Sequence, residues 1–217
     1  MRIVSLSGRA RAGKDTSALI LRNYLGHKEV NVCSFAAKLK KVCQDAFDLT
    51  DEQIDGKQKD DRLQQGRYFH PDYRMPYVIT AFGLQEDYNC RGSEWARRKT
   101  KTFWSPRELL QYVGGFLREL DEDAIIKSLD LRADKINIIT DLRVWREFDY
   151  IQRQGGHIPF VIRRRSALTM DDPTEEVANT RDYRLLSLGF YSIDNNASKR
   201  ELELALIRNL GKAGIIR

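Results

Sequence analysis

A glycine-containing segment near the start of the chain has the residue types and spacing of a phosphate-binding loop. Residues 8–14 read GRARAGK, which is the spacing G-x-x-x-x-G-K of a Walker A loop. Glycines allow the backbone to wrap closely around a phosphate, and the N-terminus of the following helix adds positive potential. The pattern predicts that the backbone of Gly8, Ala10, Ala12 and Gly13 cradles a nucleoside triphosphate while Lys14 reaches the β- and γ-phosphates. The alternative is a glycine-bearing turn without a ligand.

Acidic and hydroxyl side chains near this loop are candidate magnesium ligands. The position after the lysine, normally Ser or Thr, is Asp15, and Thr16 follows it. Asp141 and Arg143 come directly after another predicted strand. An acid at that place orients magnesium or its waters, and an arginine can clamp phosphate. The alternative for Asp141 is that it simply caps the helix that follows.

Strand-like and helix-like segments alternate along most of the chain. The predicted strands cover residues 2–7, 30–35, 135–140, 157–163 and 191–193. The predicted helices cover residues 16–25, 36–47, 145–154 and 199–210. This alternation predicts an α/β fold with a five-stranded parallel sheet flanked by helices.

A second group of basic and amide side chains is the candidate site for a phosphate acceptor. Lys40 follows the second predicted strand, at the edge where open α/β sheets bind ligands. Residues 105–108 (SPRE) form a capping box with proline at the first helical position, so a helix begins there. At about 100° per residue, Arg107, Gln111, Gly114 and Arg118 fall on one polar face of that helix. The alternative for all four side chains is a solvated helix surface.

Three other regions carry weaker signals. Three adjacent arginines at 163–165 open a polar stretch, and we expect residues 163–180 to form a lid in which Arg163 covers a transferring phosphoryl group. Asn195 follows the last strand and is expected near the nucleotide base, although a plain turn explains it equally well. Residues 51–104 are rich in charge and aromatics and are expected to form an inserted, mainly helical subdomain.

Composition narrows the class of protein. The 217 residues carry a formal net charge of +6, which favours polyanionic partners such as nucleotides or nucleic acid. No apolar run approaches the roughly 18 residues that a membrane-spanning helix needs, and the first residues resemble a strand rather than a signal peptide. Three cysteines without a CxxC pair favour reduced thiols in a cytoplasmic compartment. We therefore expect a cytoplasmic protein without membrane contact.

Taken together, these residues resemble the phage-type deoxynucleoside monophosphate kinases. The resemblance spans nearly the whole chain and is carried by residues 13–16 (GKDT), 34–40 (SFAAKLK), 107–111 (RELLQ), Asp141 with Arg143 and Glu147, and the glycine pair 155–156. The GKDT ending is the most discriminating piece, because ordinary Walker loops lack its aspartate. The chain departs from the family at residues 114–116 (GGF) and in having three arginines where the lid strand ends.

The resemblance implies one P-loop kinase domain over residues 1–217 that transfers the γ-phosphate of ATP to a deoxynucleoside 5′-monophosphate with the help of Mg²⁺. It implies catalytic roles for Lys14, Asp141, Arg143 and Arg163. Asp15, Thr16 and Asp141 would hold the metal, and Lys40, Arg107, Gln111 and Arg118 would hold the acceptor. A phage-encoded member would work in the host cytoplasm, and the aromatics of residues 51–104 would suit a base pocket or a homodimer contact.

Three rival functions stay open at this point. Residues 91–104 interleave basic and aromatic side chains, as in a surface that stacks on nucleic acid, so the chain could phosphorylate a modified base in DNA such as 5-hydroxymethyluracil. A small-molecule kinase of the dephospho-coenzyme A type has a similarly built loop. A nucleotide-binding switch without turnover would need the loop alone.

Overall fold

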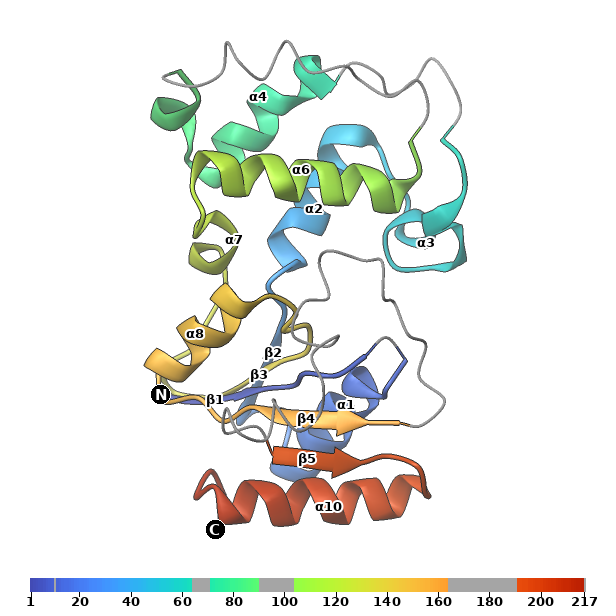
Figure 1. Cartoon of the computed structure of the whole chain (residues 1–217), viewed down its shortest axis with the longest axis vertical. Helices are drawn as coiled ribbons and strands as arrows, with labels where there is room; N and C mark the ends of the chain where they lie inside the picture. Colours follow the sequence, from blue (N-terminus) through green and yellow to red (C-terminus); the bar gives the residue numbers. More distant parts are fainter. Residues whose placement is uncertain (10, 64–70, 90–103, 164–190, 217) are drawn as a thin grey trace. The chain divides into compact units, whose positions relative to one another are not determined.

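A computed structural model describes residues 1–9, 11–63, 71–89, 104–163 and 191–216 (Figure 1). Several predicted features lie outside these ranges. They are Ala10, Arg164 and Arg165, the rest of the predicted lid beyond Arg163, and residues 64–70 and 90–103 of the predicted insertion.

The chain divides into two compact units. The first combines Met1–Ser34 with Asp130–Arg217, and the second is Phe35–Leu129. The predicted insertion, residues 51–104, falls inside the second unit. The residues of the predicted phosphate loop therefore belong to the first unit, and the acceptor candidates belong to the second.

All five strands of the first unit run parallel, but they do not form the single five-stranded sheet that we expected. One sheet has the order β1-β3-β2 and the other pairs β4 with β5. The strands are β1 (Arg2–Ser5), β2 (Val30–Cys33), β3 (Ile136–Ile139), β4 (Pro159–Ile162) and β5 (Tyr191–Asp194). The predicted α/β class is thus confirmed, with sheets of three and two strands in place of one of five.

The missing N–H group of Pro159 explains why the two sheets are separate. His157 N donates to Ile3 O at 2.9 Å and Ser5 N donates to His157 O at 2.8 Å, which starts a parallel ladder between β1 and β4. The next donor on that side would be the nitrogen of Pro159, which carries no hydrogen. Pairing resumes where Ser7 N donates to Pro159 O at 3.0 Å, so only the isolated bridges Val4–His157 and Ser7–Phe160 remain.

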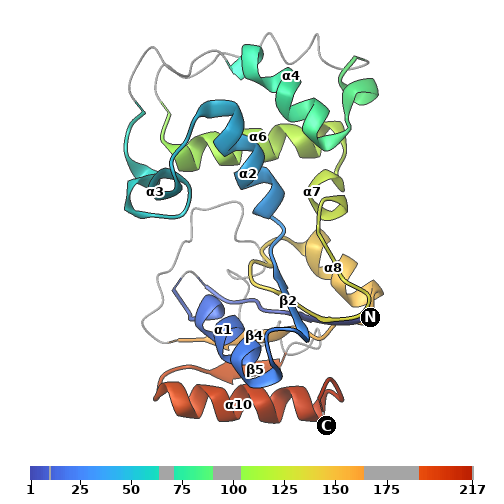
Figure 2. The ribbon, with the colours of Figure 1, turned by 180° about the vertical axis from the view of Figure 1, so that it is seen from behind.

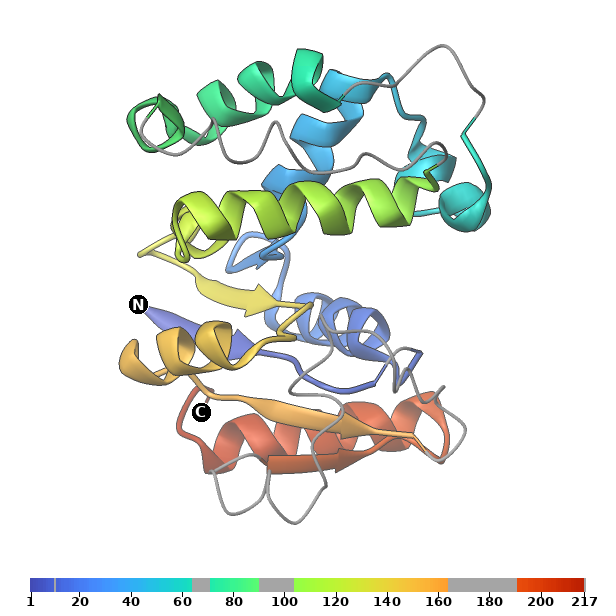
Figure 3. The same cartoon turned by 45° about the horizontal axis from the view of Figure 1, so that its top comes forward.

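Helices cover both faces of these sheets. Ile3 and Val4 are both buried although they point to opposite faces of β1, as expected for a strand covered on two sides. The helices of this unit are α1 (Lys14–Leu25), α8 (Trp145–Arg153) and α10 (Lys199–Lys212). Helices α1 and α10 lie side by side (Figure 2) and share one apolar core with the strands, whereas α8 leads into the start of β4 (Figure 3).

The second unit is helical in its described part. Its elements are α2 (Ala37–Phe47), α3 (Asp51–Ile54), the 3₁₀ turn η1 (Lys57–Asp60), α4 (Pro71–Phe82), α6 (Pro106–Leu120) and α7 (Ala124–Lys127). The predicted capping box starts α6: the Ser105 hydroxyl accepts from Glu108 N, and the Glu108 carboxylate accepts from Ser105 N. Gly114 of this helix is buried against Leu39 of α2, so it serves helix packing rather than the polar face we had assigned to it.

No helix within the described ranges is long and apolar enough to cross a membrane.

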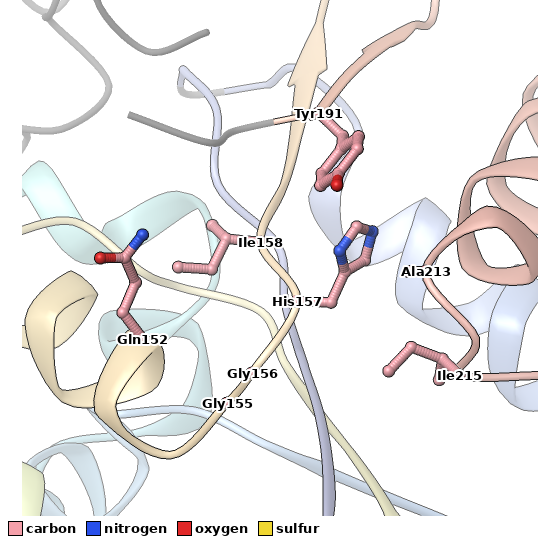
Figure 4. Close-up of a pocket in the computed structure, with 8 residues that line it drawn as sticks. All are labelled: Gln152, Gly155, Gly156, His157, Ile158, Tyr191, Ala213 and Ile215. Carbon is pink, nitrogen blue, oxygen red and sulfur yellow. The ribbon is translucent and has the colours of Figure 1, made fainter. Parts of the chain in front are cut away.

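His157 is a buried histidine at the amino end of β4. Its Nε2 lies 2.6 Å from Asn209 Oδ1 of α10, and its ring packs under Tyr191 with 4.7 Å between centroids (Figure 4). Burial lowers the pKa of His157 below its ordinary value, while the bond to Asn209 acts in the opposite direction.

The lowered pKa predicts a specific pH dependence of stability. Because the folded state takes up the proton less readily than the unfolded state, the contribution of His157 is complete above pH of about 6.5 and is lost as the pH falls below it. When the pH is lowered from 7.5 to 5.5, the free energy of unfolding measured with urea should fall less for His157→Gln than for the wild type. His27→Gln removes an exposed imidazole and is the control. An equal loss in the wild type and His157→Gln would contradict the prediction.

Candidate functional site

The segment between β1 and α1 requires glycine at both ends of the predicted loop. Gly8 has φ +142°, and a Cβ placed there would lie 2.4 Å from Val161 O of β4. Gly13 has φ +103°, and its Cβ would lie 2.2 Å from Asn195 Nδ2. Side chains are strained at both φ angles; a Cβ would overlap the backbone of β4 at position 8 and the Asn195 amide at position 13, so both positions favour glycine.

Lys14 is the first residue of α1, and its ammonium lies against the loop. Nζ donates to Gly8 O at 2.5 Å and to Arg9 O at 3.1 Å. The side chain therefore turns back over residues 8–13 rather than out into solvent. A positive charge above a tight loop at a helix N-terminus is an arrangement that attracts phosphate oxygens.

The metal candidates of the first unit are two exposed residues and one buried one. Asp15 and Thr16 are exposed in the first turn of α1, and Asp141 is 9% exposed at the end of β3. No group of three or more His, Cys, Asp and Glu side chains comes together in the part of the chain that the structure describes.

The parallel register places Asp141 at the same edge of the sheet as the loop. Ser5 of β1 and Cys33 of β2 both pair with Ile139, and Thr140 N donates to Cys33 O at 3.2 Å. Burial, with added repulsion from Asp141 and then Asp130, raises the pKa of the Cys33 thiol to about 12. Cys33 thus stays a protonated thiol at neutral pH.

A buried carboxylate fixes the turn that carries Asp141 and Arg143. Glu147 is 4% exposed, and its Oε2 accepts the N–H of Arg143 at 2.9 Å and of Val144 at 3.2 Å. Two backbone N–H groups at the start of α8, which have no acceptor within the helix, thus find one in this carboxylate. Glu147 therefore orients the turn and is a residue that the family pattern named without stating its role.

The carboxyl ends of β4 and β5 complete this edge. Arg163 is exposed and follows Ile162, the last residue of β4. Asn195 follows β5; its N–H donates to Ile162 O at 2.8 Å and its Nδ2 donates to Ala12 O at 2.7 Å. The structure thus brings Lys14, Asp141, Arg143, Arg163 and Asn195 to one edge of the first unit, with Asn195 bound to the loop itself.

The four acceptor candidates lie on α2 and α6 of the second unit. Lys40 Nζ is 2.5 Å from Asp55 Oδ1, and Arg107 Nε is 2.5 Å from Asp60 Oδ1. The hydrogen bond from Arg107 holds the pKa of Asp60 below its ordinary value. Both acids belong to residues 51–60. No local sequence pattern relates either acid to its basic partner, so these ion pairs were not predicted from the sequence.

Gln111 and Arg118 are half-buried on α6. Gly115 has open space where a side chain would be, whereas Arg118 Nη1 lies 3.7 Å from the Cβ position of Gly114. The face of α6 that carries Arg107, Gln111 and Arg118 is therefore partly covered.

Most of the basic aromatic segment, residues 91–104, lies outside the described ranges. Its last residue, Trp104, is 6% exposed and packs against Tyr112 with 4.7 Å between ring centroids. This indole belongs to the core of the second unit and offers no surface for a nucleic-acid base.

A cavity of about 250 Å³ lies at the opposite edge of the first unit, at the amino ends of β4 and β5 (Figure 4). Its lining residues are Gln152, Gly155, Gly156, His157, Ile158, Tyr191, Ala213 and Ile215. The predicted site residues are absent from this lining, so the cavity is separate from the phosphate loop.

The chain was compared with known proteins. It is 27% identical over 212 residues to a protein of Acanthamoeba polyphaga mimivirus named "Putative deoxynucleotide monophosphate kinase", a match that spans 89% of this chain and 91% of that protein. The similarity is to a nucleotide kinase. No family model matches the chain.

The role of Glu147 can be tested by its effect on stability. Glu147→Ala leaves two N–H groups at the start of α8 without their acceptor, and we expect a loss of about 1–3 kcal/mol in the free energy of unfolding. Glu147→Gln keeps one side-chain oxygen and should lose less. Urea unfolding checks both variants against Asp149→Ala, which removes an exposed acid of the same helix. A loss for Glu147→Ala no larger than that for Asp149→Ala would contradict the assignment.

Proposed function

We propose that the protein is an ATP-dependent kinase that transfers the γ-phosphate of ATP to a deoxynucleoside 5′-monophosphate, giving the diphosphate and ADP. The observation that carries the proposal is the loop of residues 8–14, where two glycines admit no side chain and the Lys14 ammonium folds over the backbone. The similarity to a named deoxynucleotide monophosphate kinase over about nine-tenths of both chains supports the choice of acceptor. The parallel α/β arrangement is compatible with a kinase fold.

In this proposal the loop binds the triphosphate by exchange of hydrogen bonds. Lys14 donates to two loop carbonyls in the structure, and phosphate oxygens would replace them as acceptors. Bonds from the ammonium to neutral carbonyl oxygens are exchanged for bonds to charged phosphate oxygens, so the ammonium keeps acceptors throughout. Lys14 then lies where negative charge develops on the transferring group.

Phosphoryl transfer makes a bond between an oxygen of the acceptor phosphate and the γ-phosphorus, and it breaks the bond from that phosphorus to the β–γ bridging oxygen. Mg²⁺, when bound, would neutralise charge on the β- and γ-phosphate oxygens. Asp141, with Asp15 or Thr16, offers oxygen ligands at the loop edge. Arg143 and Arg163 would place positive charge beside the transferring group, and no covalent enzyme intermediate is needed.

On the acceptor side, the proposal assigns the monophosphate to Lys40, Arg107, Gln111 and Arg118. Asp55 and Asp60 support this assignment, because carboxylates sit on Lys40 and Arg107 where phosphate oxygens would bind. The acceptor would exchange with these exposed ion pairs, which are weak in water.

The first test is ATP consumption with magnesium in the presence of dAMP, dGMP, dCMP, dTMP or 5-hydroxymethyl-dUMP, each compared with a short DNA duplex. We expect turnover with at least one free monophosphate, and a loss of about 10²-fold or more for Lys14→Ala because a cation facing the transition-state charge is removed. Circular dichroism of Lys14→Ala checks that the fold is kept.

Two results would contradict the proposal: turnover with DNA alone, or undiminished turnover by Lys14→Ala. DNA-only turnover would favour the kinase acting on a base in DNA. ATP binding without transfer to any acceptor would favour a nucleotide-binding switch.

The acceptor assignment predicts a difference between the two substrates. Arg107→Ala should raise KM for the monophosphate about 10-fold or more, since one charge-assisted hydrogen bond is lost, and should leave KM for ATP within about twofold. Asp60→Asn is the matched control, because it removes the carboxylate partner of Arg107 and keeps the guanidinium. Steady-state kinetics with each substrate varied in turn provide the measurement. An equal rise of both KM values in Arg107→Ala would remove Arg107 from the acceptor site.

A further inference from the structure

Asn195 contacts the phosphate loop rather than open space at the sheet edge. Its Nδ2 donates to Ala12 O at 2.7 Å, and its own N–H donates to Ile162 O at 2.8 Å. The backbone of Asn195 is therefore held by the end of β4, while its side chain holds the loop. We had expected this residue near the nucleotide base, but one donor of its amide is engaged with the loop backbone.

The bond to Ala12 fixes the orientation of one peptide group. The carbonyl of Ala12 and the N–H of Gly13 belong to the same planar trans peptide and point in opposite directions. Because the carbonyl is directed at Asn195, the Gly13 N–H is directed away from it. Among the described residues, no backbone acceptor receives this N–H, so it remains available to a ligand of the loop.

The contact also explains why position 13 has no side chain. A Cβ on Gly13 would lie 2.2 Å from Asn195 Nδ2 and 3.4 Å from its Cγ. Ala12 is 1% exposed and packs in the core shared by α1 and α10. The amide of Asn195 thus lies against the last turn of the loop, directly before α1 begins at Lys14.

From these contacts we propose that Asn195 is a positioning residue: it holds the Ala12–Gly13 peptide so that the Gly13 N–H faces the phosphates of the bound nucleotide. The inference rests on the proposed ATP-dependent function, and it assigns Asn195 to nucleotide binding through the loop rather than through the base. The adjacent Asn196 provides a contrast, because its amide donates to Asp194 Oδ1 within the turn and its backbone N–H donates to the same oxygen at 2.9 Å.

The test compares Asn195→Ala and Asn195→Asp with Asn196→Ala as the matched control. Asn195→Ala removes one neutral hydrogen bond, so we expect KM for ATP and the Kd of a fluorescent ATP analogue to rise about 3- to 10-fold. Asn195→Asp sets a carboxylate against the Ala12 carbonyl and should raise both by about 10-fold or more. KM for the monophosphate should stay within about twofold in all three variants, and Asn196→Ala should match the wild type.

A double-mutant cycle tests the contact itself. Gly13→Ala in the wild type meets both the unfavourable φ and the Asn195 amide, whereas in the Asn195→Ala background it meets only the unfavourable φ. The combined loss of ATP affinity should therefore be smaller than the product of the two single losses. Multiplicative losses would overturn the proposed contact.

Hydrogen exchange separates this inference from the proposed function. In nucleotide-free protein, the loop amides should exchange about 10-fold faster in Asn195→Ala than in Asn196→Ala or the wild type, because the peptide is no longer held. Unchanged exchange would overturn the positioning role whatever the enzyme does. If the wild type binds no ATP, the proposed function fails, and the role of Asn195 in nucleotide binding fails with it, even where exchange shows that the side chain holds the loop.

Discussion

The peptide between Ala12 and Gly13 is the constraint on which the candidate site depends. The loop that leads from β1 to this peptide begins at Gly8, which lies against β4. The loop ends at Gly13, which lies against Asn195 in the turn after β5. Helix α1 starts at the next residue, so the direction of that peptide also sets where the helix N-terminus and its positive potential lie. Lys14, the only lysine of the loop, takes its position from the same turn.

The other residues of the first unit reach this edge by parallel register rather than by direct contact with the loop. Asp141 and Arg143 follow β3, and the Glu147 carboxylate accepts two backbone N–H groups of the turn that carries them. In the second unit, Asp55 and Asp60 occupy Lys40 and Arg107 at the surface. Such pairs exchange readily with other anions in water. The first unit therefore carries the candidate loop edge, and the second carries basic side chains that are paired with acids at its surface.

The sequence alone identified the parts of the structure that depend on local patterns. The loop, the capping box at Ser105 and the strands beginning near residues 2, 30 and 136 were predicted because spacing and hydrophobic runs act over a few residues. The break between β1 and β4 depends on which partner meets Pro159, and strand pairing was not encoded in any local pattern. The same holds for Asn195, which lies 183 positions from the carbonyl that it binds. Gly114 was wrongly assigned to the polar face of α6, because the helical period tells which residues share a face but not which element packs against that face.

The seam between β1 and β4 links the stability of the fold to the loop. Pro159 interrupts the pairing along this seam, whereas β1 and β3 pair continuously from Arg2 to Ser5. The phosphate loop crosses the seam: it starts from β1, touches Val161 of β4 at one end and is held from beyond β5 at the other. A ligand that binds the loop only when these contacts are formed would also hold the two sheets together, so by mass action its binding free energy would add to the stability of the seam. The join between the two sheets, which Pro159 interrupts, is thus the one that a nucleotide bound to the loop would reinforce.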